Sequence, residues 1–360
     1  MQTKTLGEIC RPKQWKTVAT SQLSEEGYPV YGANGIIGKY KEYNHENETI
    51  LVTCRGATCG ALNICEPFSY VNGNAMALDN LDQSIDLKYL YYFLKGRGFH
   101  DVISGSAQPQ IIRSAIERIE VPICDIETQK EITKSFAKIE KLIESKKKIL
   151  ANLDDLVKAR FVEMFSDETR WTKSTIGECC KLKSGTSLSS SKENEGGPIP
   201  YVKVGDMNLP GNEKYITTSS RFVTEATANK GLFEIGSIIF PKRGGAIGTN
   251  KKRMTKVPIC ADLNVMGVSS KGQLLPEYLF AYFEMIDLAS LSDGSSVPQI
   301  NNKNIAPLEV SIPPIALQTQ FAAFVTQVDK SKFALSNELA MGDFYIRLVH
   351  DCIMHGRIDL

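Results

Sequence analysis

The sequence predicts a mixed α/β (α+β) protein built by tandem duplication, in which two globular domains alternate with two long helices that pair as an antiparallel coiled coil. Three observations support this fold class. Similar phrases recur in the same order in both halves, short β-type runs fill each globular part, and two helical stretches carry matched apolar seams. The chain of 360 residues is long enough for two separate cores, and the duplication gives it a pseudo-two-fold internal repeat.

The repeat is clearest in one turn, where Gly105–Ile111 returns as Gly294–Ile300, 189 positions later. Four further pairs of segments keep the same order along the chain: Leu6–Cys10 with Ile176–Cys180, Arg55–Gly60 with Arg243–Gly248, Asn74–Met76 with Asn264–Met266, and Tyr89–Leu94 with Tyr278–Phe283. Because the spacing is only 170 at the domain starts, the second copy contains an insertion. We place it at Ser184–Gly197, a stretch to which we assign no counterpart.

The globular parts, residues 1–124 and 167–313, combine strand and helix signals. Runs such as Thr49–Thr53 and Ser237–Phe240 are β-type and are separated by Gly, Pro and Asn. The runs that begin at Tyr89 and Tyr278 are too dense in aromatic and aliphatic residues for an exposed strand. We expect each of them to form a core helix.

The two long helices occupy residues 125–166 and 314–360. In each, apolar residues alternate in steps of four and three, the a/d pattern of a coiled coil. The alternative is a helix packed on its own domain core; the pattern favours the coiled coil, and the chain path favours antiparallel pairing. The seams, broken at Lys146, Arg160, Lys332 and Gly342, consist of Ile132, Phe136, Ile139, Ile143, Leu150, Leu153 and Val157 in the first helix, and Phe321, Val325, Val328, Leu335, Leu339, Ile346 and Val349 in the second.

Composition narrows the class of protein only a little. A net charge of +1 argues neither for nor against nucleic acid, because a binding face can be local. The nine cysteines are scattered and often lie beside apolar residues, so we expect reduced, mostly buried thiols. Met1–Gly7 lacks an apolar signal core, and no run reaches the roughly 18 apolar residues of a membrane span. We therefore expect a cytoplasmic protein that does not bind membranes.

A search for catalytic motifs finds no candidate. Ala33–Tyr40 lacks the first Gly of a phosphate loop and has Tyr where a Ser or Thr must hold magnesium. Among four histidines, His350 and His355 are five residues apart and do not share a helical face. Pro313–Pro314 stands between isoleucines, unlike an amino-methyltransferase motif. We predict no catalytic residue, no metal site and no cofactor in this chain.

Basic loops are the remaining candidates for a binding site. Arg can read guanine through two hydrogen bonds, and Lys contacts phosphate as a point charge. The candidate DNA-binding residues are Arg55, Lys242, Arg243, Lys251 and Lys252. The alternative is ordinary solvated surface charge. Gln110 and Gln299, in the repeated Pro-Gln-Ile turn, are interpreted as structural residues that close each domain against a helix start.

Together these features resemble the specificity subunit of Type I restriction-modification systems over nearly the whole chain. The phrases that carry the resemblance are Tyr28–Gly38, the two Arg-Gly loops, the two Pro-Gln-Ile turns, and Gln129 and Gln318 near the starts of the helices. The resemblance implies two target recognition domains that each read half of a bipartite double-stranded DNA sequence, separated by spacer helices.

The same resemblance implies partners. The family's subunit binds two methyltransferase subunits, which use S-adenosylmethionine, and the assembly recruits restriction subunits driven by ATP with magnesium. Both cofactors would belong to the partners. Two other classes of protein stay open at this point: a coiled-coil scaffold whose end domains bind proteins, and a self-contained DNA-modifying enzyme.

Overall fold

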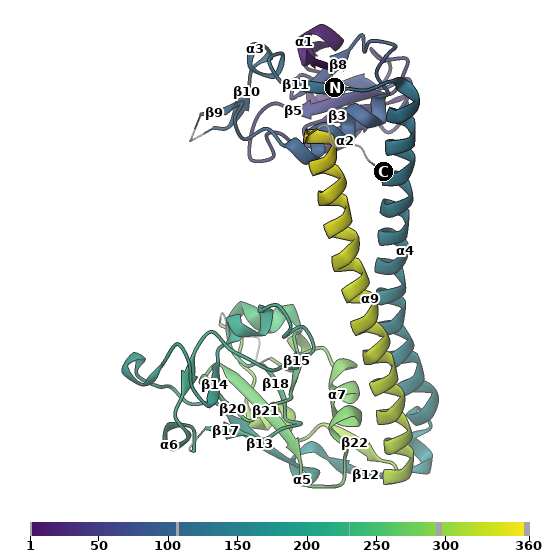
Figure 1. The fold of residues 1–360 in the computed structure, drawn as a ribbon. Coiled ribbons are helices and arrows are strands. Elements are labelled where there is room, and N and C mark those ends of the chain that lie inside the picture. The colour runs from purple at the N-terminus through teal and green to yellow at the C-terminus, as the bar shows by residue number, and fades with distance from the viewer. Residues whose placement is uncertain (1, 106–107, 230, 293–296, 356–360) are drawn as a thin grey trace. The chain divides into compact units, whose positions relative to one another are not determined.

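A computed structural model describes residues 2–105, 108–229, 231–292 and 297–355, without the side chains of residues 168, 343, 348, 349 and 352–355. It divides into two compact units, each considered by itself: unit 1 comprises Met1–Lys147 and Ser336–Leu360, and unit 2 comprises Lys148–Leu335. Helices α4 (Ile126–Phe165) and α9 (Ile315–His355) each contribute to both units (Figure 1). None of the described helices is long and apolar enough to cross a membrane.

The globular domain of unit 1 is built on two sheets. The first has the order β2-β8-β5-β6 and is antiparallel throughout, and the second, β4-β3-β7, contains one parallel pair, β3 with β7. The strands are β1 (Gln2–Thr5), β2 (Arg11–Gln14), β3 (Tyr28–Gly32), β4 (Gly35–Tyr40), β5 (Thr49–Thr53), β6 (Leu62–Cys65), β7 (Tyr70–Val71), β8 (Ala75–Asp79), β9 (Ile103–Ser104), β10 (Gln110–Ile111) and β11 (Glu120–Ile123). The helices are α1 (Leu6–Ile9), α2 (Leu87–Arg97) and α3 (Arg113–Ile116).

The globular domain of unit 2 contains a five-stranded sheet, β13-β21-β18-β19-β15, and a four-stranded sheet, β16-β14-β20-β17. Its strands are β12 (Thr172–Thr175), β13 (Cys180–Ser184), β14 (Ile199–Val202), β15 (Tyr215–Ile216), β16 (Phe222–Val223), β17 (Leu232–Phe233), β18 (Ile238–Pro241), β19 (Arg253–Thr255), β20 (Ile259–Ala261), β21 (Val265–Ser270) and β22 (Glu309–Ile312). Its helices are α5 (Ile176–Cys179), α6 (Glu225–Ala228), α7 (Pro276–Glu284) and α8 (Asn302–Ile305).

The predicted repeat is present at the level of single hydrogen bonds, which confirms the fold class. The terminal strand pair β1–β11 has its counterpart in β12–β22. Each pair leads into a short helix capped in the same way: Thr5 N donates to Glu8 at 2.6 Å, and Thr175 N donates to Glu178 at 3.0 Å. This capping box explains why a Thr-x-Gly-Glu phrase occurs at both domain starts.

The predicted position of the insertion is wrong. Residues 184–197 do have a counterpart, because both copies continue from the second strand into a 3-10 turn, at Thr20–Gln22 and Ser190–Lys192, and then into matching bridges, Ser24–Lys39 and Asn194–Phe222. The extra residues come later. Between β3 and β4 only Ala33–Asn34 intervene, whereas residues 203–221 connect β14 to β16. The Ser-rich segment 184–197 and its counterpart in the first copy, residues 14–27 with only two serines, fold alike despite little sequence similarity.

The runs at Tyr89 and Tyr278 are the core helices α2 and α7, as predicted. Both tyrosine rings are buried, and each hydroxyl donates to a backbone carbonyl just before the long helix of its own copy: Tyr89 to Pro122 at 2.8 Å and Tyr278 to Ser311 at 2.9 Å. The eight cysteines with described side chains are free thiols, and six of them are buried.

Gln129 and Gln318, near the starts of the long helices, are completely buried. The Gln129 amide accepts from Asp86 N at 2.8 Å and donates to two carbonyls, those of Ser84 and Cys124, at 2.9 Å. Gln318 repeats the pattern, accepting from Leu275 N at 2.7 Å and donating to the carbonyls of Gln273 and Pro313. One buried amide thus ties each long helix to the loop that precedes the core helix of the same domain.

The two long helices are antiparallel within each unit. In unit 1, Phe136 lies 4.8 Å from His350 between ring centres, and Lys146 forms an ion pair with Glu338. In unit 2, Asp154 pairs with Lys332 at 2.6 Å. Further along α4, the ring of Phe161 lies 5.6 Å from that of Phe321. As the residue number rises on α4, that of its partner on α9 falls.

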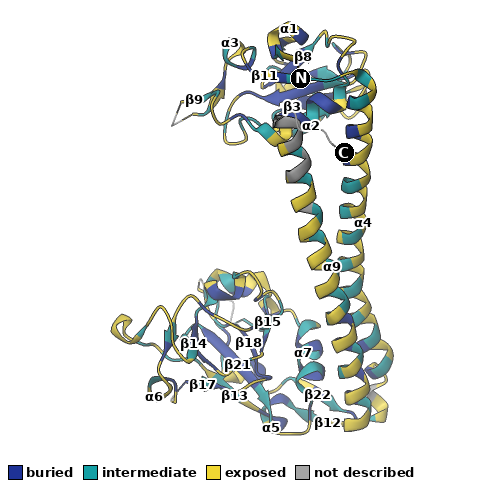
Figure 2. Cartoon of the chain, viewed as in Figure 1, coloured by how far each residue is buried: buried dark blue, intermediate teal, exposed yellow. Residues whose placement is uncertain are grey.

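The predicted seam positions with described side chains are all buried or half-buried, and Val349 lies outside the described side chains (Figure 2). They divide between the two arrangements considered for the helices. Ile132 and Phe136 join the core of the first domain, against which Ile346 of α9 also packs. Phe321 and Val325 join the core of the second domain, against which Val157 of α4 also packs. Between these ends, Ile139 and Ile143 of α4 line an apolar cavity together with residues of α9. The helix pair accommodates Lys146 and Lys332, the charged residues that interrupt the seams, because each of them pairs with a carboxylate of the opposite helix.

Candidate nucleic-acid interface

Arg55 lies directly beyond strand β5, in a backbone bridge with Gln110 of the Pro-Gln-Ile turn. Two hydrogen bonds flank the bridge: Ile111 N donates to the Cys54 carbonyl at 3.0 Å, and Gly56 N donates to the Pro109 carbonyl at 3.1 Å. This pattern defines a non-hydrogen-bonded antiparallel pair, in which the two Cα atoms are about 4.5 Å apart and the side chains leave the same face.

The second copy builds the same bridge between Arg243 and Gln299. Ile300 N donates to the Lys242 carbonyl at 2.9 Å, and Gly244 N donates to the Pro298 carbonyl at 2.8 Å. The two Arg-Gly loops and the two Pro-Gln-Ile turns, seen as separate motifs in the sequence, therefore form one local structure that occurs twice. The residues 106–107 and 293–296 of the repeated turn lie outside the described part of the chain.

Both guanidinium groups are exposed, and neither forms an ion pair or a hydrogen bond within the described residues. The glycines that follow them have positive φ angles, +90° at Gly56 and +73° at Gly244, and a Cβ added to either would meet no atom within 4 Å. These glycines are required by backbone conformation and not by crowding. The space beside each arginine is open.

The positions next to the arginines differ between the copies. Before Arg55 stands Cys54, whose sulfur accepts from Gln14 Nε2 at 2.8 Å. Before Arg243 stands Lys242, whose ammonium donates to Ser184 at 3.0 Å. The same place in the fold is therefore neutral in one domain and cationic in the other.

The segments that pack against the shared loop also differ. In the first domain they are the tip of the β3–β4 hairpin, where Thr58 Oγ1 donates to Asn34 Oδ1 at 2.7 Å. In the second they are the residues between β14 and β16, where Lys251 donates to Asn208 and Arg253 donates to the Met207 carbonyl at 3.1 Å. The predicted DNA-binding residue Lys251 is thus half-buried at this junction.

Lys252 requires a correction. Its side chain is only 2% exposed, and its ammonium donates to Asn250 Oδ1 at 2.9 Å and to the Ile286 carbonyl at 2.7 Å. Burial lowers the pKa of this amine. Lys252 therefore supports the fold from inside and does not face DNA; the sequence shows three consecutive basic residues but not which of them points inward.

The interpretation of Gln110 as a residue that closes the domain against a helix start is also corrected. Gln110 is exposed and pairs with strand β9, and Gln299 is half-buried. The residues that close the turn are Ile111 and Ile300, which are buried in the two domain cores. The sequence signal for these two pairs was that the same Arg and the same Gln occur in both copies.

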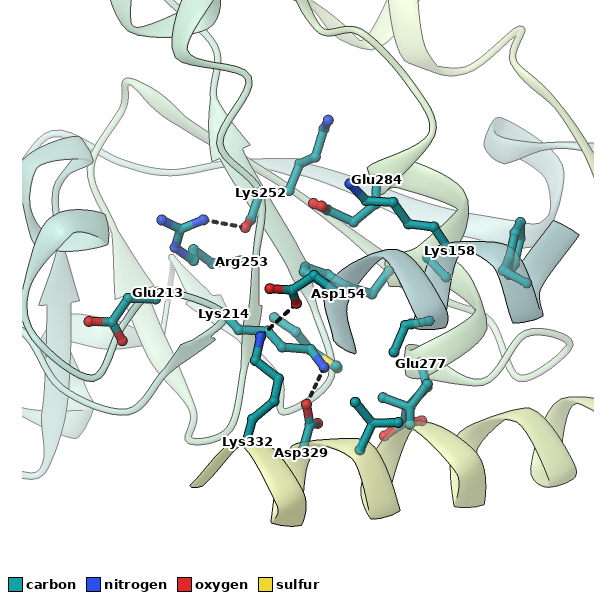
Figure 3. Close-up of a pocket in the computed structure, with 17 residues that line it drawn as sticks. Asp154, Lys158, Glu213, Lys214, Lys252, Arg253, Glu277, Glu284, Asp329 and Lys332 are labelled. Carbon is teal, nitrogen blue, oxygen red and sulfur yellow. Dashed lines mark hydrogen bonds and ion pairs between the residues drawn. The ribbon is translucent and has the colours of Figure 1, made fainter. Parts of the chain in front are cut away.

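A second structure found in both copies joins each domain to its helix. In unit 1, Glu140 of α4 accepts from the Tyr92 hydroxyl at 2.7 Å and from Lys95 at 2.9 Å. In unit 2, Asp329 of α9 accepts from the Tyr215 hydroxyl. It also accepts from Lys214 at 2.6 Å (Figure 3). We call each of these a carboxylate latch. Glu140 and Asp329 are 189 positions apart, but the partners of Glu140 come from α2, whereas those of Asp329 are Lys214 and the first residue of β15, which sequence comparison could not show.

The latch of unit 2 lines a cavity of about 360 Å³ between the helices and the domain. Figure 3 shows Lys158 and Glu284 pointing into this cavity near Lys252. Burial raises the pKa of the Glu284 carboxyl, although the neighbouring cations oppose the shift. The acidic and basic side chains that line the cavity balance in charge. The cavity therefore offers no net attraction to a phosphate backbone, unlike the exposed arginines.

Two domains that share one repeated Arg–Gln loop and alternate with two long helices define an internally duplicated protein. A family model described as Type I restriction modification DNA specificity domain matches residues 1–155 and 168–340. The chain belongs to this family of DNA specificity subunits.

Individual relatives agree with this assignment. The Type I restriction enzyme MjaIX specificity subunit of Methanocaldococcus jannaschii is 25% identical over 270 residues, which cover 66% of this chain and 61% of that protein. The solved structure of a Type I restriction-modification S subunit from M. genitalium is 18% identical and superposes with a TM-score of 0.61 over 98% of this chain and 95% of that one. Another, solved in a study of complex assembly in the type I R-M system, is 14% identical and reaches 0.58 over 98% and 97%. At these identities the two structures support the fold.

Proposed function

We propose that this specificity subunit reads an asymmetric, bipartite double-stranded DNA target, with one half-site read by each globular domain. The observation that carries the proposal is the contrast around the repeated loop. The frame is the same in both domains down to individual hydrogen bonds, whereas the flanking residues, Cys54 or Lys242, and the adjoining segments differ. Equal frames would present different side chains to the two half-sites.

The test is a domain exchange. Residues 1–124 are replaced by the matching domain of a related subunit, and the methylated sequence is determined by methylome sequencing of cells that carry the complete complex. We expect one half of the bipartite sequence to change and the other half and the spacer to stay. A change in both halves would show that the domains do not read independently.

We further propose that the paired helices dock two methyltransferase subunits, and that restriction subunits join this assembly in the cytoplasm. Large apolar side chains on the helices support this docking: Phe344 is 62% exposed and Leu142 58% in unit 1, and Phe333 is 70% exposed in unit 2. Exposed apolar surface on a coiled coil favours further helix packing. S-adenosylmethionine, ATP and magnesium would be bound by those partners.

Docking can be tested by the substitution Phe344→Ser. We expect less methyltransferase subunit to co-purify with the variant than with the unchanged chain. The control is Ile36→Ser, which removes an equally exposed apolar side chain, 56% exposed, from strand β4 of the first domain. Equal recovery of the methyltransferase with both variants would argue against the helix surface as the docking site.

We also propose that the chain has no active site of its own. Purified subunit incubated with DNA and S-adenosylmethionine should transfer no methyl group, and transfer should appear when methyltransferase subunits are added. Methyl transfer by the isolated chain would contradict the proposal.

A further inference from the structure

We propose that the two Arg–Gln pairs, Arg55 with Gln110 and Arg243 with Gln299, bind the sugar-phosphate backbone at equivalent places in the two half-sites and do not read bases. This inference rests on the proposed function and deepens it, because it separates the residues that hold DNA from those that distinguish sequences.

The Arg–Gln pair is common to both copies. A residue that selects a base should differ between two domains that read different sequences. The Arg–Gln pair does not differ, either in residue type or in the backbone bridge that sets the distance between its side chains. What two different half-sites have in common is the phosphate backbone, and contacts to it position a protein without carrying sequence information.

The side chains of Arg and Gln can both donate hydrogen bonds to phosphate oxygens. A guanidinium binds a phosphate through two parallel N–H bonds, and a Gln amide can donate a third. The non-hydrogen-bonded pairing directs both side chains to one face, about 4.5 Å apart at the Cα atoms, which suits contact with one phosphate or with two neighbouring ones. Neither Arg55 nor Arg243 has a carboxylate partner among the described residues, so neither guanidinium must first be released from an ion pair.

The glycine after each arginine leaves an open surface beside the guanidinium, with no atom within 4 Å of where a Cβ would stand. The differing polar groups lie nearby: Lys242, one residue before Arg243, in one domain, and in the other the exposed Gln14, whose amide donates to the buried Cys54 one residue before Arg55. A phosphate held by the pair would therefore bring the variable residues close to the groove that they would read.

The experiment uses the complete complex with its methyltransferase subunits and two duplexes, one that contains the methylated sequence and one in which this sequence is scrambled. Dissociation constants are measured over a series of salt concentrations for Arg55→Ala, Arg243→Ala, Arg55→Lys and Gln110→Ala. The control is Arg11→Ala, which removes an exposed arginine at the far end of strand β2 from Gln14, roughly 10 Å away at 3.3 Å per residue.

We expect each Arg→Ala change to weaken binding to both duplexes by the same factor and to reduce the slope of log affinity against log salt by about 0.9, the value for one phosphate contact. Arg55→Lys should weaken binding to both duplexes equally, because the two parallel hydrogen bonds of the guanidinium are lost. The salt slope should stay the same, because the positive charge remains. Gln110→Ala should likewise weaken both without changing the slope. Arg11→Ala should leave affinity and slope unchanged.

Loss of affinity for the methylated sequence alone, or relaxation of one position of that sequence in the methylome, would overturn the proposal in favour of base reading. An unchanged slope in both Arg→Ala variants would also overturn it. Failure of the proposed function looks different: the unchanged complex would then bind both duplexes equally, before any substitution is made.

Discussion

Single buried amides determine how each long helix leaves its domain. Gln129 and Gln318 satisfy three backbone groups each, at positions where no water reaches. The residue type is therefore dictated by geometry, since only a side chain with both a donor and an acceptor can serve these loops. This explains why two glutamines 189 positions apart survive in halves that otherwise differ widely.

The substitution Gln318→Ala should lower the free energy of unfolding by about 1–3 kcal/mol, because it leaves the Leu275 N–H and two carbonyls buried without partners. Urea unfolding monitored by circular dichroism measures the effect. Gln320→Ala, an exposed position on the same helix, is the matched control and should stay within about 0.5 kcal/mol of the unchanged chain. Equal stability of the two variants would contradict a structural role for the buried Gln318 amide.

The carboxylate latch of unit 1 makes stability depend on pH. Burial raises the pKa of Glu140, but hydrogen bonds from Tyr92 and Lys95 outweigh it, so the pKa in the folded chain is below the ordinary 4.5. A depressed folded-state pKa contributes stability above the unfolded pKa, and this contribution is lost as pH falls through the folded value. Glu140 should therefore stabilise unit 1 at neutral pH and lose this contribution progressively as the pH falls below about 4.5.

The matching measurement compares melting temperatures between pH 7 and pH 3. Glu140→Gln should melt lower than the unchanged chain at pH 7, and the difference should shrink as the pH falls. Glu144→Gln, at an exposed position one helical turn further on, provides the control for loss of a surface charge. A difference that is constant over the whole range would show that the Glu140 charge is not what stabilises the latch.

At the scale of elements, the periodicity of apolar residues predicted those helices and strands that depend mainly on local sequence. The limits of α4, the core helices α2 and α7, and strand β5 follow from apolar spacing and from breaks at Gly and Pro. The segments between β14 and β18 could not be predicted, because β15, β16 and β17 have only two residues each and depend on partners far away in sequence. The misplaced insertion has the same cause.

For the candidate site, the sequence analysis proposed Arg55 and Arg243 as DNA-binding residues and interpreted Gln110 and Gln299 as structural, but it did not show that these residues pair or that Lys252 is buried. Pairing of Arg55 with Gln110 joins positions 55 residues apart, and a single sequence contains no signal for such a bridge except its repetition. Burial of one lysine among three basic residues depends on acceptors contributed by Asn250 and Ile286. Both features arise from tertiary contacts.

Gly342 interrupts the seam of α9 at a place where the opposite helix comes close. A Cβ added there would lie 3.2 Å from Ile143 Cγ1, and an apolar cavity of about 250 Å³ adjoins both residues. Ile143 can move into that cavity by the few tenths of an ångström that the contact requires. Gly342→Ala should then stabilise unit 1 by up to about 1 kcal/mol through helix propensity.

Urea unfolding of Gly342→Ala gives the sign of the change. Ala340→Gly, the reverse exchange at an exposed position two residues away, calibrates the propensity effect and should cost about the same amount. If Gly342→Ala destabilises unit 1, the helices need glycine for close approach and Ile143 cannot move.

At the scale of the whole molecule, α4 and α9 each run through both units. The 40 residues of α4 connect the two globular domains along the chain, so under the proposed function its length would set the distance between the two half-sites. The seam repeats every seven residues, which permits a change of length without a change of facing side chains. A seven-residue insertion corresponds to about 10 Å of helix.

We expect insertion of one heptad in each helix, between Lys146 and Asp154 in α4 and between Lys332 and Glu338 in α9, to lengthen the unread spacer by roughly three base pairs at 3.4 Å each while both half-sites stay the same. These positions face each other through the ion pairs Lys146–Glu338 and Asp154–Lys332, so the added heptads would meet. Methylome sequencing measures the spacer directly. A four-residue insertion at the same places rotates the seam away and should abolish methylation, whereas an active heptad variant with an unchanged spacer would show that the helices do not act as a ruler.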